Sequence, residues 1–248
     1  MELITDENGI NQIFRPSPAM TVRTHRRADR IREALLASPS NPVRALEIGC
    51  GTAEMSFLVA NDPRIQLTAA DISPKFIEAA QSQPARPNIR FQLADVTAPA
   101  FLNQHKGQFD FVIGNGILHH LVNNIDGVFK NLRVILKPGG RLVFWEPNLQ
   151  NPLVYFMFGT KLGRRLMRLD PDEMAFTKSW IAERLQRNGY IVHELRCRDF
   201  LLPNTPSFLI KPLIWLGDLL ERTPFSFLAQ SIFLVATKSD AADQSPTS

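Results

Sequence analysis

The sequence has little cysteine. Cys50 and Cys197 are the two cysteines among 248 residues, and neither stands in a Cys-x-x-Cys pair. This excludes a disulfide framework and a cysteine-based zinc site, so we expect both residues to be reduced thiols. The opening residues, MELITDENGI, are acidic and contain no apolar run of the kind that a secretory signal needs. The cytoplasm is therefore the expected compartment.

The chain also lacks a large excess of one charge, because its formal net charge is +4. Two arginine-rich clusters nevertheless occur, one between Arg23 and Arg32 and the other between Lys161 and Arg168. We expect most of these arginines to form solvated helix faces. No aromatic residues are interleaved with them for base stacking, so no nucleic-acid partner is expected.

The composition, 44% hydrophobic and 21% charged, is typical of a folded protein, and the length suits one domain with embellishments. Short apolar runs alternate with helix-length segments, which predicts an α/β fold with a doubly wound sheet covered by helices on both faces. The seven expected strands are Ala45–Ile48, Gln66–Ala70, Ile89–Leu93, Phe109–Ile113, Arg141–Trp145, Tyr190–Leu195 and Ser231–Ala236.

The remaining segments divide the chain further. A helix is expected over Thr24–Ala37, and residues 1–38 are predicted to form an N-terminal helical segment that contributes to the site. Residues 39–238 are predicted to form the main domain, with two insertions, 149–178 and 198–230, acting as a substrate lid. Residues 239–248 are polar and are expected to be a disordered tail.

A glycine turn follows the first expected strand in the run ALEIGCGTA, and a helical pattern begins directly after it. Such a turn lets backbone approach a ligand closely. Asp71 stands twenty residues after Gly51, at the end of the second strand, where a carboxylate can accept hydrogen bonds from both hydroxyls of a ribose. Together these features predict a cofactor of the adenosine type.

The residue at position 54 separates two kinds of adenosine cofactor. A nicotinamide site of the form G-x-G-x-x-G would need glycine there, whereas this chain has Glu54, whose charge would oppose a pyrophosphate. S-adenosylmethionine contains no phosphate and carries a sulfonium and an ammonium, so acidic groups around its turn are favourable.

The ordered runs ALEIGCGTA, AADIS, LADV, FDFVIGNGILHHL and LKPGGRLVFWEPN resemble the successive motifs of class I S-adenosylmethionine-dependent methyltransferases. The resemblance covers about Arg44 to Asn148 and the final strand pair. It implies a Rossmann-like sheet with its last strand antiparallel, S-adenosyl-L-methionine as cofactor and S-adenosyl-L-homocysteine as product. Ala53 stands where the family usually has a third glycine, and we expect only a slightly displaced turn.

The same resemblance assigns roles to individual residues near the cofactor. Glu47, Gly49 and Gly51 would shape the pocket for the methionine end, and Asn115 would lie beside the methionine moiety. Asp71 would hold the ribose. The other cofactor-binding positions that the resemblance implies are Ile72, Asp95 and Val96.

Three residues are candidates for removing a proton from the methyl acceptor. His119 and His120 follow the loop after the fourth strand, and Glu146 ends the fifth. Histidine titrates in the range that suits a general base, which favours O-methylation of a hydroxyl. No group of Asp, Glu and His has the spacing of a metal site, so no metal is predicted, although these three residues could meet in space.

The two insertions are rich in apolar residues and predict a small or lipid-like acceptor. Apolar residues at 209, 213, 216 and 220 recur at helical spacing and would face the core, a second copy, a greasy substrate or a membrane interface. Peripheral membrane contact and the choice between monomer and homodimer stay open. The alternative functions are a nicotinamide-dependent oxidoreductase and a catalytically silent methyltransferase-like scaffold.

Overall fold

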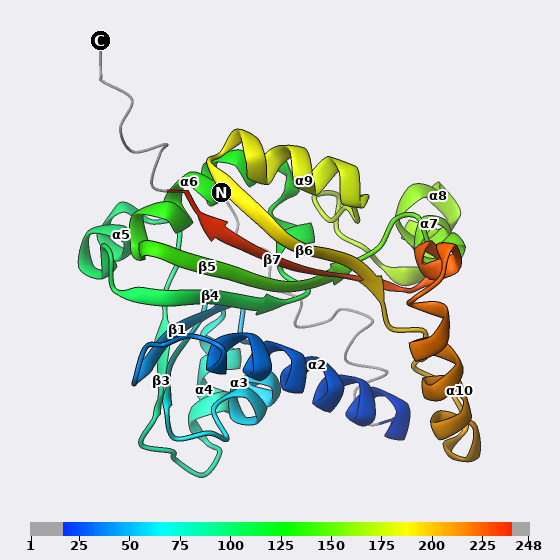
Figure 1. The fold of residues 1–248 in the computed structure, drawn as a ribbon, viewed down its shortest axis with the longest axis horizontal. Coiled ribbons are helices and arrows are strands. Elements are labelled where there is room, and N and C mark those ends of the chain that lie inside the picture. Colours follow the sequence, from blue (N-terminus) through cyan, green and yellow to red (C-terminus); the bar gives the residue numbers. More distant parts are fainter. Residues whose placement is uncertain (1–16, 240–248) are drawn as a thin grey trace.

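The computed structural model describes residues 17–239, and it shows one seven-stranded sheet between two layers of helices (Figure 1). The strands are β1 (Val43–Ile48), β2 (Ile65–Asp71), β3 (Ile89–Leu93), β4 (Phe109–Asn115), β5 (Leu136–Pro147), β6 (Tyr190–Arg198) and β7 (Ser231–Lys238). Their order across the sheet is β3-β2-β1-β4-β5-β7-β6. Strands β1 to β5 are parallel to their neighbours, whereas β7 is antiparallel to both β5 and β6. The predicted fold class, with its antiparallel last strand, is confirmed.

The helices of one layer cover β1, β2 and β4. They are α2 (Pro18–Leu36), α3 (Glu54–Val59) and α4 (Pro74–Gln81). Helix α2 begins at Pro18, earlier than expected, because the Ser17 side chain accepts a hydrogen bond from the backbone of Met20 and so caps the helix. Its buried residues Ala28, Ile31 and Leu35 recur at helical spacing and pack against β1 and β2.

The opposite layer contains α5 (Pro99–His105), α6 (Ile125–Ile135) and α9 (Lys178–Arg187). Helix α6 buries a continuous apolar stripe, and its members are Ile125, Val128, Phe129, Leu132 and Ile135. All of β4 except its last residue is buried, because helices cover this central strand on both faces.

The insertions form the end of the molecule toward which the carboxyl ends of the parallel strands point (Figure 1). The first contains α7 (Pro152–Gly159) and α8 (Lys161–Met167), and the second contains α10 (Ser207–Leu220) and the short helix η4 (Pro224–Leu228). Two further short helices, η2 (Leu118–His120) and η3 (Val122–Asn124), follow β4. No helix of residues 17–239 is long and apolar enough to cross a membrane. Most of the predicted tail falls outside the described residues, as do residues 1–16 of the N-terminal segment.

Candidate active site

The turn between β1 and α3 adopts backbone conformations that favour glycine. Gly49 and Gly51 have φ angles of +65° and +54°, and a Cβ atom on Gly49 would lie 2.6 Å from the Ile117 side chain. Ala53 also lies in the left-handed region, at φ +68°, where an L-residue is strained by about 1 kcal/mol. Alanine therefore preserves the turn that glycine usually makes there, at a cost in strain.

Asp71 joins this turn to the end of β2. Its two carboxylate oxygens accept backbone N–H groups, one from Gly51 at 2.8 Å and the other from Ser73 at 2.9 Å. Each carboxylate oxygen has a further lone pair, so Asp71 can still accept hydrogen bonds from a ligand. The next residue, Ile72, is half-buried. The structure thus places a carboxylate directly beside the glycine turn.

Two acidic side chains, Glu47 and Asp71, lie close together at the turn. Glu47 is buried, and within the described residues its carboxylate has one side-chain donor, the Ser56 hydroxyl at 2.5 Å. Burial and the neighbouring charge of Asp71 raise the pKa of the Glu47 carboxyl to about 8. Burial and these same two acids also raise the pKa of the Cys50 thiol. Such a site fits a cationic ligand, whereas it opposes a pyrophosphate.

The other predicted cofactor residues lie along the same sheet edge. Asp95 follows β3, is exposed, and accepts hydrogen bonds from the backbone and hydroxyl of Thr97 at 2.8 and 2.6 Å. Val96 packs partly against the core. Asn115 ends β4 and accepts a hydrogen bond from Arg27 at 2.8 Å, which fixes the orientation of its side-chain amide.

Arg27 belongs to a buried polar network that sequence reasoning missed. Arg23 and Arg27 of α2 both pair with Asp199, which follows β6, and both reach Ser231 at the start of β7. Burial, together with the charge of Arg23, lowers the pKa of Arg27 to about 10. These two arginines are exceptions to the expected solvated helix face. They attach α2 to the carboxyl edge of the sheet.

Glu146 organises the segment that carries His119. The buried carboxylate accepts the backbone N–H groups of Ile117, Leu118 and His119 at 2.9, 2.7 and 3.2 Å. It also contacts Nδ1 of the His119 ring at 3.0 Å. A carboxylate partner holds the imidazole proton on Nδ1 and leaves the lone pair on Nε2. The arrangement can therefore present Nε2 of His119 as a proton acceptor.

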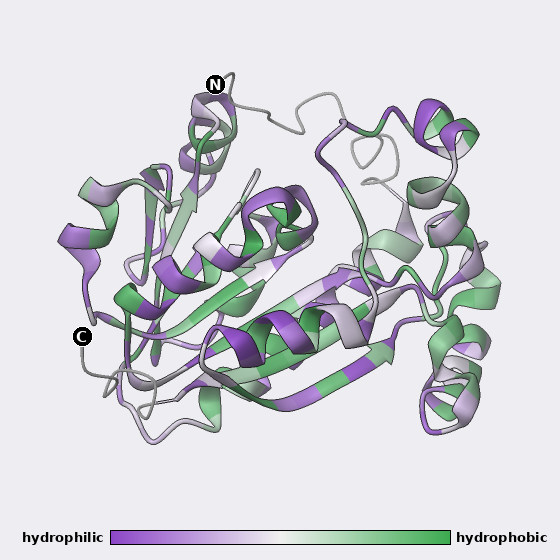
Figure 2. Cartoon of the chain, turned by 90° about the horizontal axis from the view of Figure 1, so that it is seen from above, coloured by the Kyte–Doolittle hydropathy of each residue, from purple (hydrophilic) through white to green (hydrophobic). Residues whose placement is uncertain are grey.

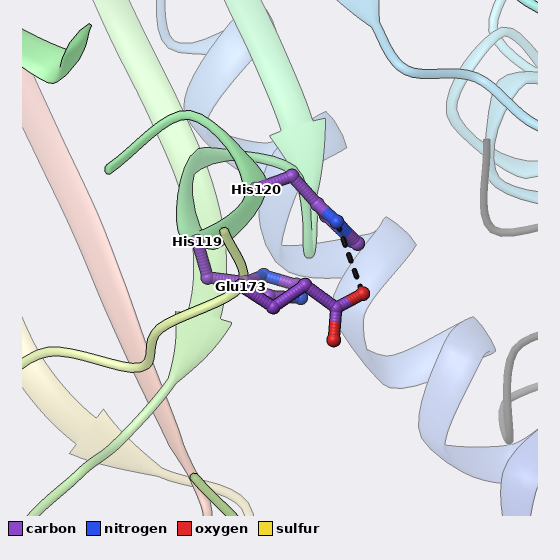
Figure 3. Close-up of side chains that lie close together, drawn as sticks. All are labelled: His119, His120 and Glu173. Carbon is purple, nitrogen blue, oxygen red and sulfur yellow. Dashed lines mark ion pairs between the residues drawn. The ribbon is translucent and has the colours of Figure 1, made fainter. Parts of the chain in front are cut away.

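A second histidine–carboxylate pair, His120 with Glu173, lies beside His119 (Figure 3). Nδ1 of His120 is 3.2 Å from Oε1 of Glu173, which reaches the site from the first insertion. The backbone N–H of Met174 donates to the carbonyl of His119 at 3.0 Å and ties the insertion to this turn. Burial and the adjacent His119 lower the pKa of His120 to about 3, so its ring is neutral.

Ligand atoms of His119, His120 and Glu173 lie within 4.8 Å of one another and could hold a metal ion. From the sequence, Glu146 is the acid that could meet the two histidines in space, but in the structure the acid of this group is Glu173. No sequence signal marked Glu173, since it stands in the polar stretch DPDEM far from either histidine.

Comparisons with known proteins show which family and fold the chain resembles. Residues 46–142 match the family model described as a methyltransferase domain. A highly reducing polyketide synthase of Cordyceps militaris is 26% identical over 237 residues, which cover 87% of this chain and 9% of the synthase. A malonyl-[acyl-carrier protein] O-methyltransferase of Paenibacillus is 33% identical over 105 residues, covering 41% of this chain and 37% of that protein.

A solved structure of the CurJ carbon methyltransferase superimposes with a TM-score of 0.62 at 19% identity, over 92% of this chain and 57% of that one. This likeness shows a shared fold. The chain spans a small fraction of the length of the polyketide synthases that it matches. Residues 46–142 therefore carry a methyltransferase domain, and the motif order and the fold of the chain are those of the class I S-adenosylmethionine-dependent methyltransferases, whose cofactor is S-adenosyl-L-methionine.

Proposed function

We propose that this protein transfers a methyl group from S-adenosylmethionine to a small, acyl-type acceptor from which His119 removes a proton. The observation that carries the proposal is the 3.0 Å contact between Nδ1 of His119 and the buried carboxylate of Glu146. In the structure Glu146 also holds three consecutive backbone N–H groups of the same turn. The base is therefore fixed in position before any acceptor arrives.

The cofactor is proposed to lie over the carboxyl ends of β1, β2 and β4 and, when bound, to supply an electrophilic methyl group. The acidic pair Glu47 and Asp71 would attract its positive charges, and the remaining lone pairs of Asp71 would accept the ribose hydroxyls. The other proposed cofactor positions are Gly49, Gly51, Ile72, Asp95, Val96 and Asn115. Arg27 supports this role for Asn115, since it occupies the amide oxygen and leaves the amide N–H groups for a ligand.

Two acceptor atoms lose a proton on methylation and would need such a base. The first is a hydroxyl oxygen, as the sequence predicts. The second is a carbon next to a carbonyl, and the resemblance to polyketide synthases and to a carbon methyltransferase favours it. In either case the proton passes to Nε2 of His119, and Glu146 stabilises the imidazolium. The insertions 149–178 and 198–230 are proposed to close over this acceptor and exclude water.

The test uses His119→Ala with methyl-labelled cofactor and a panel of hydroxyl-bearing and β-oxoacyl thioester acceptors. Turnover should fall by about a hundredfold or more, whereas affinity for S-adenosylhomocysteine should stay unchanged. His193→Ala is the matched control, because His193 is exposed on β6 and bonds only Thr237 among the described residues. NMR of the labelled product identifies the methylated atom.

Near-normal turnover and an unaltered pH profile in His119→Ala would contradict side-chain base catalysis. A chelator should leave the parent rate unchanged, because proton removal by His119 needs no metal, whereas inhibition by the chelator would assign a metal ion to the group of His119, His120 and Glu173. Thermal stabilisation by S-adenosylhomocysteine and not by NAD excludes the oxidoreductase alternative, and methyl transfer to any acceptor excludes a silent scaffold.

A further inference from the structure

Exposed apolar side chains gather at the insertion end of the molecule. Among the described residues, all exposed large hydrophobic side chains except Leu93, Val134 and Ile191 lie in the two insertions, 149–178 and 198–230. In both views these segments, α7, α8, α10 and η4, occupy the same end of the molecule (Figures 1 and 2). We call this surface the apolar end, and its main members are Leu153, Tyr155, Leu162, Leu166, Phe208, Trp215, Leu216, Leu219, Phe225 and Phe227.

Helix α10 shows that core packing does not explain this surface. One side of the helix is anchored through Ile210, which packs against Ala19 of α2 and Leu201. Phe208 and Trp215, two helical turns apart, are 78% and 71% exposed. An exposed apolar concentration of this kind marks an interaction surface.

The charges of the apolar end favour an anionic partner. Five exposed cations in this part of the chain have no side-chain ion pair in the described structure, and they are Lys161, Arg165, Arg168, Lys211 and Arg222. Two of the acids around them are in ion pairs, Asp218 with Arg26 and Glu221 with Arg198, whereas Asp172 accepts a hydrogen bond from the neutral side chain of Asn123 and keeps its charge. Asp170 is the one acid of residues 149–228 whose carboxylate has no described partner. The surface therefore combines exposed apolar groups with an excess of unpaired positive charge.

A cavity connects this surface to the sheet edge. Its volume is about 320 Å³, and its walls are Asn151, Pro152, Leu153, Phe200, Leu202, Leu228 and Gln230. Gln230 accepts a hydrogen bond from Arg23, and its carbonyl accepts one from the backbone of Asn148, two residues beyond Glu146 on the chain. One wall of the cavity thus includes Gln230, which joins the end of β5 to the start of β7, and the other includes Leu153 of the apolar end.

We propose that the apolar end docks on an anionic lipid surface and that the methyl acceptor is a lipid-soluble molecule that enters through this cavity. The second half of this inference rests on the proposed function, but the docking itself does not. The exposed residues come from four separate elements and combine Trp, Phe and Leu with Lys and Arg, which is the composition of an interfacial membrane surface. The apolar side chains enter the headgroup boundary and the cations contact anionic headgroups.

The test measures co-sedimentation of the full chain with vesicles of equal parts phosphatidylcholine and phosphatidylglycerol, against vesicles of phosphatidylcholine alone. Binding should require the anionic lipid and weaken with salt. One double variant combines Phe208→Ser with Trp215→Ser, and a second combines Arg165→Glu with Lys211→Glu. Each should bind the anionic vesicles at least about tenfold more weakly than the parent. The matched controls Leu93→Ser and Lys106→Glu change exposed residues elsewhere and should bind as the parent does.

Melting shifts with S-adenosylhomocysteine check that every variant is folded and binds cofactor, so a failure of docking is distinguishable from a failure of the proposed function. Equal binding to both vesicle types, or none to either, would overturn the proposal. Concentration-dependent dimers in sedimentation velocity that Trp215→Ser abolishes would assign the surface to a second copy instead. The protein could also bind vesicles and methylate water-soluble acceptors but no lipid-soluble ones. That result would overturn the proposed lipid-soluble acceptor and leave the docking proposal standing.

Discussion

Glu47 and Glu146 occupy comparable positions, each buried near the carboxyl end of a parallel strand, but their surroundings differ. Glu146 accepts three backbone N–H groups and contacts a histidine. Glu47 has a single hydroxyl donor in the described structure, and its pKa is raised to about 8. We call the surroundings of Glu146 the acceptor half of the site and those of Glu47 the cofactor half. In the acceptor half, protein donors stabilise the buried carboxylate. In the cofactor half, the carboxylate has too few donors, and a cationic ligand would stabilise its charged form.

This difference in hydrogen-bond donors shows how one fold combines a rigidly held base with a cofactor site whose protonation changes when the ligand binds. A carboxylate held by several donors keeps a fixed geometry, which orientation of a base requires. A carboxyl group that favours its protonated form in the absence of a cation gains its charge only when a cation binds. The following substitutions test this contrast.

The largest effect is expected from Glu146→Gln. The amide would place N–H groups against the backbone donors of residues 117–119 and would leave buried donors without acceptors. Turnover should fall by about a hundredfold or more, and the melting temperature should fall as well. Steady-state kinetics and thermal unfolding measure the two effects. Parent-like kinetics would show that this half of the site does not depend on the carboxylate.

Asp71→Ala should have the next largest effect, and it acts on the cofactor half. The variant loses the acceptor of the Gly51 and Ser73 N–H groups and the proposed acceptor of the ribose hydroxyls. Affinity for S-adenosylhomocysteine should fall by about 2 to 3 kcal/mol, measured by calorimetry. Asp62→Ala is the control, because Asp62 is a turn residue that pairs with Arg64. An unchanged affinity would remove Asp71 from the proposed site.

The smallest of these effects is a pH dependence that only Glu47 should confer. Its pKa is raised from 4.5 to about 8 in the folded chain, so the folded state holds a proton that the unfolded state releases between these values. The contribution of Glu47 to the free energy of unfolding is therefore fully present below about pH 4.5 and is lost as the pH rises toward 8. A bound cation favours the charged form, so affinity for S-adenosylmethionine should rise by up to about tenfold over the pH unit below 8.

Calorimetry in buffers of different ionisation enthalpy measures the proton that binding releases. Glu47→Gln should abolish this release and flatten the pH dependence, whereas Glu54→Gln, an exposed neighbour, should change neither. Proton release that persists in Glu47→Gln would assign it to another group and would break the contrast between the two carboxylates.

The sequence predicted the fold well because strand periodicity and the glycine turn are local signals. Each of the seven expected strands is present, although β5 begins at Leu136 and not at Arg141. Its first residues, including Gly139 and Gly140, have the composition of a turn, so β-propensity alone could not include them in a strand. Pairing of Leu136 with Phe109 of β4 extends the strand by tertiary contact.

The site was predictable only where a motif marks it. Glu146 and His119 were candidates from their positions, but their mutual contact depends on the register of β5 beside β4. Glu173 and Arg27 were not found, because each reaches the edge from a segment distant in sequence. Long-range contacts of single polar side chains leave no periodic pattern, and so they require the three-dimensional structure.

The strand order also has a consequence for biosynthesis. Strand β6 has one neighbour in the sheet, β7, which follows it in the chain. A ribosome therefore delivers β6 before its partner exists, and its backbone groups cannot pair until the last strand emerges. Until then the open edge of β5 is also exposed to other nascent chains. Completion of the sheet, and of the buried arginine network that ends on Ser231, therefore waits until β7 has been translated.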